Sequence, residues 1–297
     1  MSKYNFSHVR RSYQFILIAI FMLVGVVVVP TVWAGNVSLE NAGNPTPLLA
    51  TIAVNSTADN LTASDGNCTL REAIQNANSD SDTTGGDCVA GSGIDTITLP
   101  AGTFTVALAG IEENNAGGDF DLLDDVTIVG DSAGTTYIDG GAIDRVFDLR
   151  SGAATVTFQD LTIQNGNSVA SGGGVYIENN AVVTVTLTSV ALKNNAALSG
   201  GAIYYNPNMS GAAMSLNQVE LSGNMATTDG GGIYVRGDGV TIVNSTVSNN
   251  SANNNGGGLY LRNTGCCAGG IAISFSTIAN NVAEADSSGV GMGGGGA

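Results

Sequence analysis

Large apolar residues recur at matched positions through the second half of the 297-residue chain. Five reference positions, separated by 29, 29, 26 and 31 residues, mark the repeat: Gly166, Asn195, Asn224, Asn250 and Asn281. The residues ten, eight and three positions before each reference are all apolar: Val156, Phe158 and Ile163; Val185, Leu187 and Leu192; Met214, Leu216 and Leu221; Val240, Ile242 and Val247; Ile271, Ile273 and Ile278. A period of this length is typical of solenoid proteins.

The spacing inside each repeat predicts two short strands joined by a corner. The residues ten and eight before the reference are two apart, so they share one face of a strand, whereas the next step of five cannot stay on that face. We therefore place a corner at the position six before the reference. Its residues are mostly of types that tolerate turns: Asp160, Ser189, Gln218, Asn244 and Phe275.

A glycine run and another short strand follow each reference position. These segments read GGGVYI at 172–177, GGAIYY at 200–205, GGGIYV at 230–235 and GGGLYL at 256–261. One aliphatic residue in each segment is followed by a tyrosine, so the two side chains point to opposite faces of the strand. Each repeat thus supplies two or three strands separated by corners, which predicts an all-β fold, a parallel β-helix or β-solenoid.

Stacked turns bury apolar side chains that no single turn can bury alone. We expect Leu187, Leu216, Ile242 and Ile273 to form one continuous interior column. Asparagines at the corners are expected to form amide ladders, at Asn194, Asn249 and Asn280. Less regular turns are expected upstream, at 121–130, 135–140 and 145–149.

The stretch NCTLREAIQNAN at 67–78 interrupts this pattern with a short amphipathic helix. Thr69 followed by Glu72 fits a capping box, and Leu70, Ala73, Ile74 and Ala77 form one apolar stripe. A solenoid end exposes unpaired strand edges, so we interpret the helix as a lid. Strand-like segments at 50–54 and 95–99 flank it. A disulfide between Cys68 and Cys88 can close this unit, although spacing alone does not prove the pairing.

The first 34 residues indicate that the mature chain lies outside the cytoplasm. Residues 1–34 combine three basic residues, an apolar run and a final Val32-Trp33-Ala34, which indicates a cleaved signal peptide; an uncleaved membrane anchor is the alternative. Without them the chain has 6 basic and 25 acidic residues, a net charge of −19, so nucleic acid is a poor partner. The only histidine, His8, lies in the signal, which excludes histidine-dependent catalytic and zinc sites from the mature chain.

Four segments carry a resemblance to a known group of proteins: CTLREAIQNAN, DTITLPAGTFT at 95–105, GGDFDLLDDVTIVG at 117–130 and IDGGAIDRVFDL at 138–149. They resemble the N-terminal module of bacterial extracellular proteins that contain the CSLREA motif, with threonine here in place of serine. The later GGGIY repeats resemble right-handed parallel β-helices and, more loosely, polymorphic outer-membrane proteins. The resemblance implies a surface or secreted protein without defined catalytic residues.

The expected domain organisation follows from these segments. It comprises a signal peptide at 1–34, a linker at 35–49, a cap module at 50–110 and a β-helix at 111–297 that stops where another strand is due. We expect no membrane insertion of the mature region. The pair Cys266-Cys267 lies in a loop and receives no chemistry.

A carbohydrate-active enzyme is the alternative function, because polysaccharide lyases and hydrolases also use parallel β-helices, yet fold alone decides nothing. A lyase needs a basic residue, and Lys193, Arg236 and Arg262 are the candidates, although a solvated or structural role is the simpler explanation for them. The adjacent pair Asp124-Asp125 suits acid–base work or, more simply, the capping of turns.

Calcium and glycans are the candidate ligands. Asp119, Asp121, Asp124 and Asp125 form a carboxylate-rich segment of the kind that calcium prefers. The column Tyr176, Tyr204, Tyr234 and Tyr260 is a candidate platform for stacking sugars, and the alternative is that the rings stack on one another. We expect a secreted or cell-surface protein with a structural or adhesive role, whose partners are extracellular glycans or other surface proteins.

Overall fold

The computed structural model describes residues 49–110, 114–150, 152–177, 183–207, 211–237, 239–263 and 269–284. These residues belong to one compact unit, Pro45–Ala297. The predicted signal peptide, nearly all of the predicted linker, Cys266-Cys267 and residues 285–297 lie outside the described residues. Among the described residues, no helix has the length and apolar character needed to cross a membrane.

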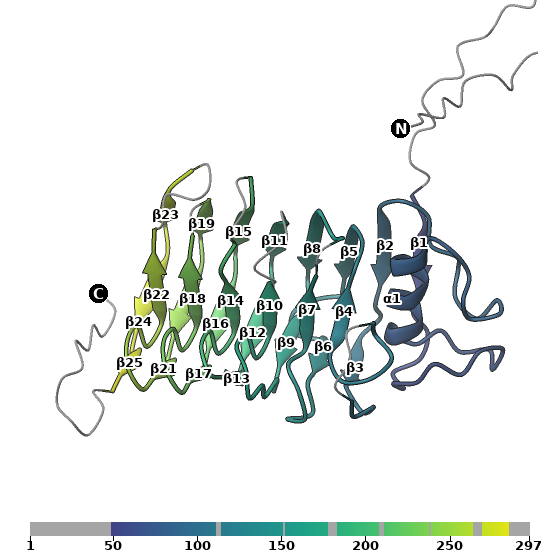
Figure 1. The fold of residues 1–297 in the computed structure, drawn as a ribbon, viewed down its shortest axis with the longest axis horizontal. Coiled ribbons are helices and arrows are strands. Elements are labelled where there is room, and N and C mark those ends of the chain that lie inside the picture. The colour runs from purple at the N-terminus through teal and green to yellow at the C-terminus, as the bar shows by residue number, and fades with distance from the viewer. Residues whose placement is uncertain are drawn as a thin grey trace, which may run out of the picture. The chain divides into compact units, whose positions relative to one another are not determined.

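The described unit is a parallel β-solenoid of stacked turns (Figure 1), which confirms the predicted fold class. An eight-stranded sheet contains β1 (Thr51–Ala53), β2 (Asp95–Thr98), β5 (Val126–Val129), β8 (Thr155–Gln159), β11 (Thr184–Thr188), β15 (Ala213–Asn217), β19 (Val240–Val243) and β23 (Ile271–Ser274). A seven-stranded sheet contains β3 (Gly102–Thr105), β6 (Thr136–Asp139), β9 (Thr162–Gln164), β12 (Ala191–Lys193), β16 (Glu220–Ser222), β20 (Thr246–Ser248) and β24 (Thr277–Ala279).

Two smaller sheets complete the turns. A six-stranded sheet contains β4 (Phe120–Leu122), β7 (Phe147–Leu149), β10 (Val175–Ile177), β14 (Ile203–Tyr205), β18 (Ile233–Arg236) and β22 (Leu259–Arg262). A four-stranded sheet contains β13 (Ala196–Ala197), β17 (Met225–Ala226), β21 (Ser251–Ala252) and β25 (Val282–Ala283). Neighbouring strands come from successive turns, so backbone hydrogen bonds in both directions link each turn to the next.

The predicted interior column is present. Leu187 is in register with Leu216, and Leu216 with Ile242, and all three side chains are at most 1 % exposed. Ile273 continues the register but is 39 % exposed, which corrects the expectation that it is buried. The physical reason is that β23 is the last described strand of its sheet, so no further turn covers it.

The predicted corners also form, and their backbone explains the residue types. Asp160, Ser189, Gln218, Asn244 and Phe275 all adopt the left-handed region, with φ between 51° and 56°. Asparagine and aspartate enter this region more readily than other residues that have a side chain. Phe275 is the exception in residue type, and it is 87 % exposed.

The amide ladder lies one residue after its predicted position. Asn194, Asn249 and Asn280 adopt left-handed conformations with φ of 55–56° and turn the chain. The buried ladder is formed by the next residue of each turn, Asn195, Asn224, Asn250 and Asn281. The Nδ2 of each of the first three donates to the Oδ1 of the following rung at 2.9–3.1 Å, and Asn281 Nδ2 donates to the Val247 carbonyl. The prediction was wrong because two adjacent residues share the corner and the backbone turns only the second one inward.

The helix α1 (Leu70–Ser79) is the predicted lid, and its capping box between Thr69 and Glu72 is present. It lies beside the first strands of the solenoid (Figure 1), and its apolar stripe is buried. Asn78 replaces a missing strand at the edge of β4: its Nδ2 donates to the Asp121 carbonyl at 2.8 Å and its Oδ1 accepts from Leu123 N at 2.9 Å. The helix thus satisfies backbone groups that a free edge leaves unpaired.

The disulfide between Cys68 and Cys88 forms, as predicted, and ties the start of α1 to the loop that follows it. The sheets run through the boundary that we placed at residue 110. Both β1 and β2 belong to the same eight-stranded sheet as the later turns, so the cap segment supplies the first rungs of the solenoid.

Candidate functional site

The outer face of the six-stranded sheet carries one uninterrupted column of aromatic side chains. Tyr176, Tyr204, Tyr234 and Tyr260 stand in register on β10, β14, β18 and β22. The residues before them, from Val175 onwards, point into the core, so the alternation predicted from the VYI-type segments is observed. This face is the best candidate for a binding surface.

The four rings stack on one another. Successive ring centroids are 5.4, 4.9 and 4.9 Å apart, and each pair of ring planes differs by 10°. These spacings are close to the distance between neighbouring strands, so the ring faces look along the stack and the ring edges look outward. The geometry favours the second of the two interpretations of the column, since the inner ring faces are already occupied and a sugar meets edges and hydroxyl groups.

The hydroxyl groups form the polar rim of this column. The Tyr204 hydroxyl accepts a hydrogen bond from Asn206 Nδ2 at 3.1 Å. Burial, and then the neighbouring Tyr204 and Tyr260, raise the pKa of Tyr234 above its usual value of 10. The Tyr234 hydroxyl therefore stays protonated at neutral pH and can donate a hydrogen bond.

A guanidinium group closes the N-terminal end of the column. The Arg145 Cζ lies 4.7 Å from the centroid of the Tyr176 ring, a cation–π contact. The same side chain reaches two carboxylates: Nε is 3.1 Å from Asp119 Oδ2, and Nη1 is 3.1 Å from Asp148 Oδ2. Asp148 also accepts from Arg150 Nη1 at 2.9 Å. The tyrosine column and an ion cluster are therefore one continuous feature.

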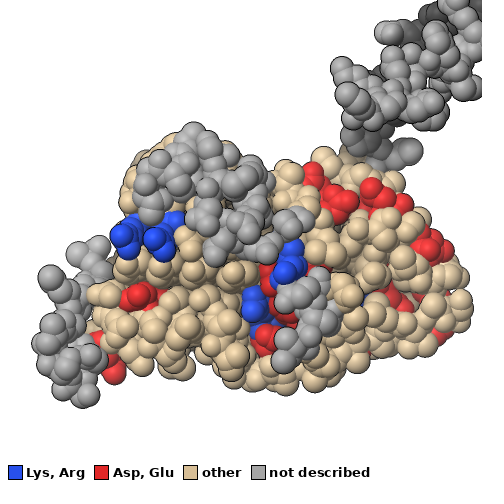
Figure 2. All heavy atoms as spheres, in the orientation of Figure 1, with Lys and Arg blue, Asp and Glu red and all other residues tan. Residues whose placement is uncertain are grey.

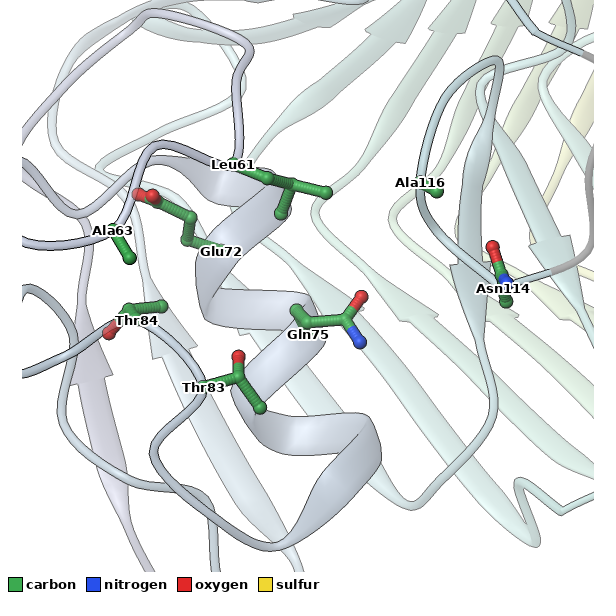
Figure 3. A pocket seen from close by; sticks show the side chains of 8 residues that line it. All are labelled: Leu61, Ala63, Glu72, Gln75, Thr83, Thr84, Asn114 and Ala116. Carbon is green, nitrogen blue, oxygen red and sulfur yellow. The ribbon is translucent and has the colours of Figure 1, made fainter.

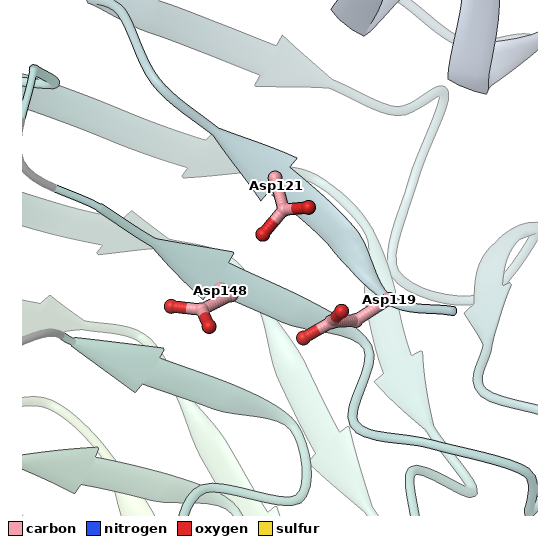
Figure 4. Close-up of side chains that lie close together, drawn as sticks. All are labelled: Asp119, Asp121 and Asp148. Carbon is pink, nitrogen blue, oxygen red and sulfur yellow. The ribbon is translucent and has the colours of Figure 1, made fainter. Parts of the chain in front are cut away.

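Asp119, Asp121 and Asp148 bring their carboxylates together at this end (Figure 4). Their ligand-type oxygens lie within 4.8 Å of one another, and each residue is at most 6 % exposed. Asp119 and Asp121 belong to the predicted calcium set. The third carboxylate of the cluster, Asp148, was not predicted and comes from the next turn. Arg145 lies 3.1 Å from a carboxylate oxygen of both Asp119 and Asp148, so the protein places a cationic group of its own here.

The other two members of the predicted calcium set lie elsewhere. Asp125 Oδ1 accepts from Ala154 N and Thr155 N, each at 2.6 Å, and Asp124 Oδ1 accepts from Asp125 N at 2.7 Å. Both carboxylates thus cap backbone groups between turns, which is the simpler of the two roles that the sequence suggested for this pair.

Burial dominates the electrostatics of the ion cluster. The pKa of Asp119 is raised from 3.8 to about 8, chiefly by burial; Arg145 opposes the shift, and the nearby Asp121 and Asp148 add to it. A carboxyl that is only 6 % exposed is poorly placed to reach a polymeric substrate. Its raised pKa therefore reports an internal charge arrangement rather than a general acid at a surface.

Arg71, in the middle of the CTLREA segment, is a central residue whose role the sequence did not reveal. It is fully buried, and its Nε and Nη2 contact the two carboxylate oxygens of Asp59 at 2.6 and 3.2 Å. It also donates to the carbonyls of Gly118 and Asp119 and stacks on the Phe120 ring at 4.6 Å. This side chain fixes the lid to the loop that carries the first carboxylate of the cluster.

The remaining basic side chains differ in their pairing. Lys193 Nζ lies 2.9 Å from Glu220 Oε2, away from the tyrosine column. Arg236 and Arg262 are in register on β18 and β22, and both are exposed. In Figure 2, acidic side chains gather towards the cap and basic side chains form two groups, one of them over β18 and β22.

Two pockets lie near the N-terminal turns. One, of about 290 Å³, is lined by Glu72 and Gln75 of α1, by Thr83 and Thr84, and by loop residues that include Asn114 (Figure 3). The second, of about 500 Å³, is lined mainly by small residues together with Ile143, Asp144 and Val169. Glu72 Oε2 is hydrogen-bonded within its own helix cap, whereas Oε1 has no hydrogen-bond partner among the described residues.

Comparison of the chain with models of protein families, with curated proteins and with solved structures finds no match.

Proposed function

We propose that this chain is an exported, secreted or surface-displayed β-solenoid with a structural or adhesive role, related to extracellular proteins of the CSLREA type. The observation that carries the proposal is the Cys68–Cys88 disulfide, which ties the start of the lid helix to the loop that follows it. Disulfides persist in oxidising compartments and are rare in cytosolic proteins. The signal-like residues 1–34 and the sequence resemblance support the same location.

The adhesive part of the proposal rests on the tyrosine face. A long, regular face with repeated hydroxyl edges can contact an extended partner at many points, because each turn offers the same groups at the same spacing. We propose extracellular glycans as its ligands, contacted through hydroxyl groups and ring edges. The enzymatic alternative gains no specific support, since Lys193 is paired and Asp124 and Asp125 cap backbone groups.

Export and binding are tested separately. A bacterium that expresses the full chain is fractionated, and external protease and an antibody to the solenoid report display, while mass spectrometry locates the processed N-terminus. We expect a disulfide-bonded chain outside the cytoplasm that begins near residue 35. A reduced chain confined to the cytoplasm would contradict the proposal. The purified chain is then incubated with neutral and acidic polysaccharides, and we expect binding without release of reducing ends or unsaturated products.

A further inference from the structure

Two arginines on the tyrosine face form no ion pair with any residue that the structure describes. Among the described residues, Arg71, Arg145, Arg150 and Lys193 each form an ion pair, whereas none is formed by Arg236 or Arg262. These two stand directly beside each other, as Cα partners on neighbouring strands. Like charges placed opposite one another on a sheet destabilise it. An exposed pair of this kind, in a strongly acidic chain, calls for an explanation.

The pair belongs to the tyrosine face by register. Arg236 and Arg262 each follow a tyrosine by two residues, so their side chains leave the sheet on the same side as the ring. The residue between each tyrosine and its arginine points the other way: Val235 is buried, and Leu261, its partner in register, is partly buried. The outer surface of β18 and β22 therefore offers two guanidinium groups beside two phenol hydroxyls. It is a compact set of donors, since guanidinium has only donors and a protonated phenol donates as well.

These groups define the chemistry of a ligand. Two adjacent guanidinium groups bind carboxylate or sulfate groups through paired, charge-assisted hydrogen bonds. Hydroxyl edges suit a partner that is itself rich in hydroxyl groups. Nucleic acid fits poorly, because the inner ring faces are occupied by neighbouring rings and cannot stack with bases.

We propose that the face formed by Tyr234, Tyr260, Arg236 and Arg262 binds an acidic glycan, with its carboxylate or sulfate groups on the arginine pair and its hydroxyl groups along the tyrosine edges. The inference rests on the proposed glycan-binding role and specifies its ligand class. Acidic side chains gather around the cap (Figure 2) and would repel an acidic glycan there, so we place the ligand at the C-terminal turns.

Binding of the exported full chain to immobilised polygalacturonate, heparin and dextran tests the proposal. Polygalacturonate carries carboxylates, heparin carries sulfates as well as carboxylates, and dextran is uncharged. The wild type is expected to bind at least one acidic probe, to bind dextran more weakly, and to lose affinity when salt rises from about 0.1 to about 1 M. The variant R236Q/R262Q is expected to bind the acidic probe about tenfold more weakly or worse.

Two controls separate the arginine pair from general effects. K193Q removes a positive charge from outside the face and is expected to leave affinity within about twofold of the wild type. R236K/R262K keeps the charge but not the paired geometry and is expected to show an intermediate loss. Thermal unfolding of every variant confirms that the solenoid is intact.

Three results would overturn the proposal: equal affinity for dextran and the acidic glycans, unchanged binding by folded R236Q/R262Q, or tighter binding of a single-stranded oligonucleotide. The first two results contradict the acidic-glycan site but not the glycan-binding role proposed above. A chain that reaches the surface but binds none of the three glycans rejects both this proposal and the adhesive part of the proposed function, whereas display is judged by the fractionation experiment alone.

Discussion

Replacing Asn224 by alanine removes one rung from the middle of the buried amide ladder. Asn224 Oδ1 accepts from Asn195 N at 3.0 Å and from Asn195 Nδ2 at 3.1 Å, and its Nδ2 donates to Leu192 O at 2.9 Å and Asn250 Oδ1 at 2.9 Å. The residue is fully buried, so water cannot replace these partners without opening the stack.

The expected cost follows from the groups that lose their partner. Asn195 N and Leu192 O are each left without this side-chain bond, whereas Asn195 Nδ2 keeps Ile163 O and Asn250 Oδ1 keeps the Asn224 backbone N–H. A buried polar group left unsatisfied costs about 1–3 kcal/mol. Two such groups therefore predict a loss of about 2–6 kcal/mol in the free energy of unfolding.

Equilibrium urea unfolding, followed by circular dichroism, measures this loss. Asn249→Gly is the matched control. Asn249 directly precedes the next ladder residue, Asn250, and is exposed and left-handed at φ 56°, so glycine keeps the backbone conformation and the change is expected to stay within about 0.5 kcal/mol. Asn224→Asp adds a second test, since a buried carboxylate faces the Leu192 carbonyl and the variant should recover stability as pH falls. An Asn224→Ala variant as stable as the control would refute the ladder as a stabilising element.

Three further predictions concern the cap and the ion cluster. Arg71→Met leaves the buried Asp59 carboxylate without its ion pair and should lower the free energy of unfolding by about 3–5 kcal/mol, whereas D59N/R71M should recover part of the loss; thermal melts decide. Cys68→Ser should cost about 3 kcal/mol in urea unfolding, and reduction of the wild type should match it. The pKa of Asp119 is raised to about 8, so its contribution to stability is fully present below pH 4 and is lost as pH rises through 8; Asp119→Asn should flatten that part of the stability profile, and an unchanged slope would contradict the raised pKa.

The repeat made most of the fold predictable. Each turn places the same residue types at the same slots, so apolar positions such as Leu187 and Leu216 and corner positions such as Ser189 could be assigned without knowing any contact. The lid was predictable because its capping box and apolar stripe are local features. Ile273 was not, since its exposure depends on what covers the last described strand.

The site was less predictable because its geometry depends on partners from other turns. Asp148 completes the carboxylate cluster only through the register of β7 with β4. Arg71 finds Asp59 in a stretch without periodicity, so no pattern marked the pair. The tyrosine column was visible in the sequence, yet the orientation of its rings follows from stacking across strands and decides that edges, not faces, meet a ligand.

Spin-label distances along one column of the eight-stranded sheet test the central claim, that successive turns stack in register, most directly. The outward residues Thr96, Thr127, Thr157, Thr186, Ser215, Thr241 and Ala272 form this column. Labels on cysteines at Thr96 and Ala272, with Cys266 and Cys267 changed to serine, span six strand spacings and should lie about 29 Å apart; moving the first label to Thr127 should shorten the distance by about 5 Å. Distances that follow separation along the chain instead of the number of turns would contradict the stacked solenoid.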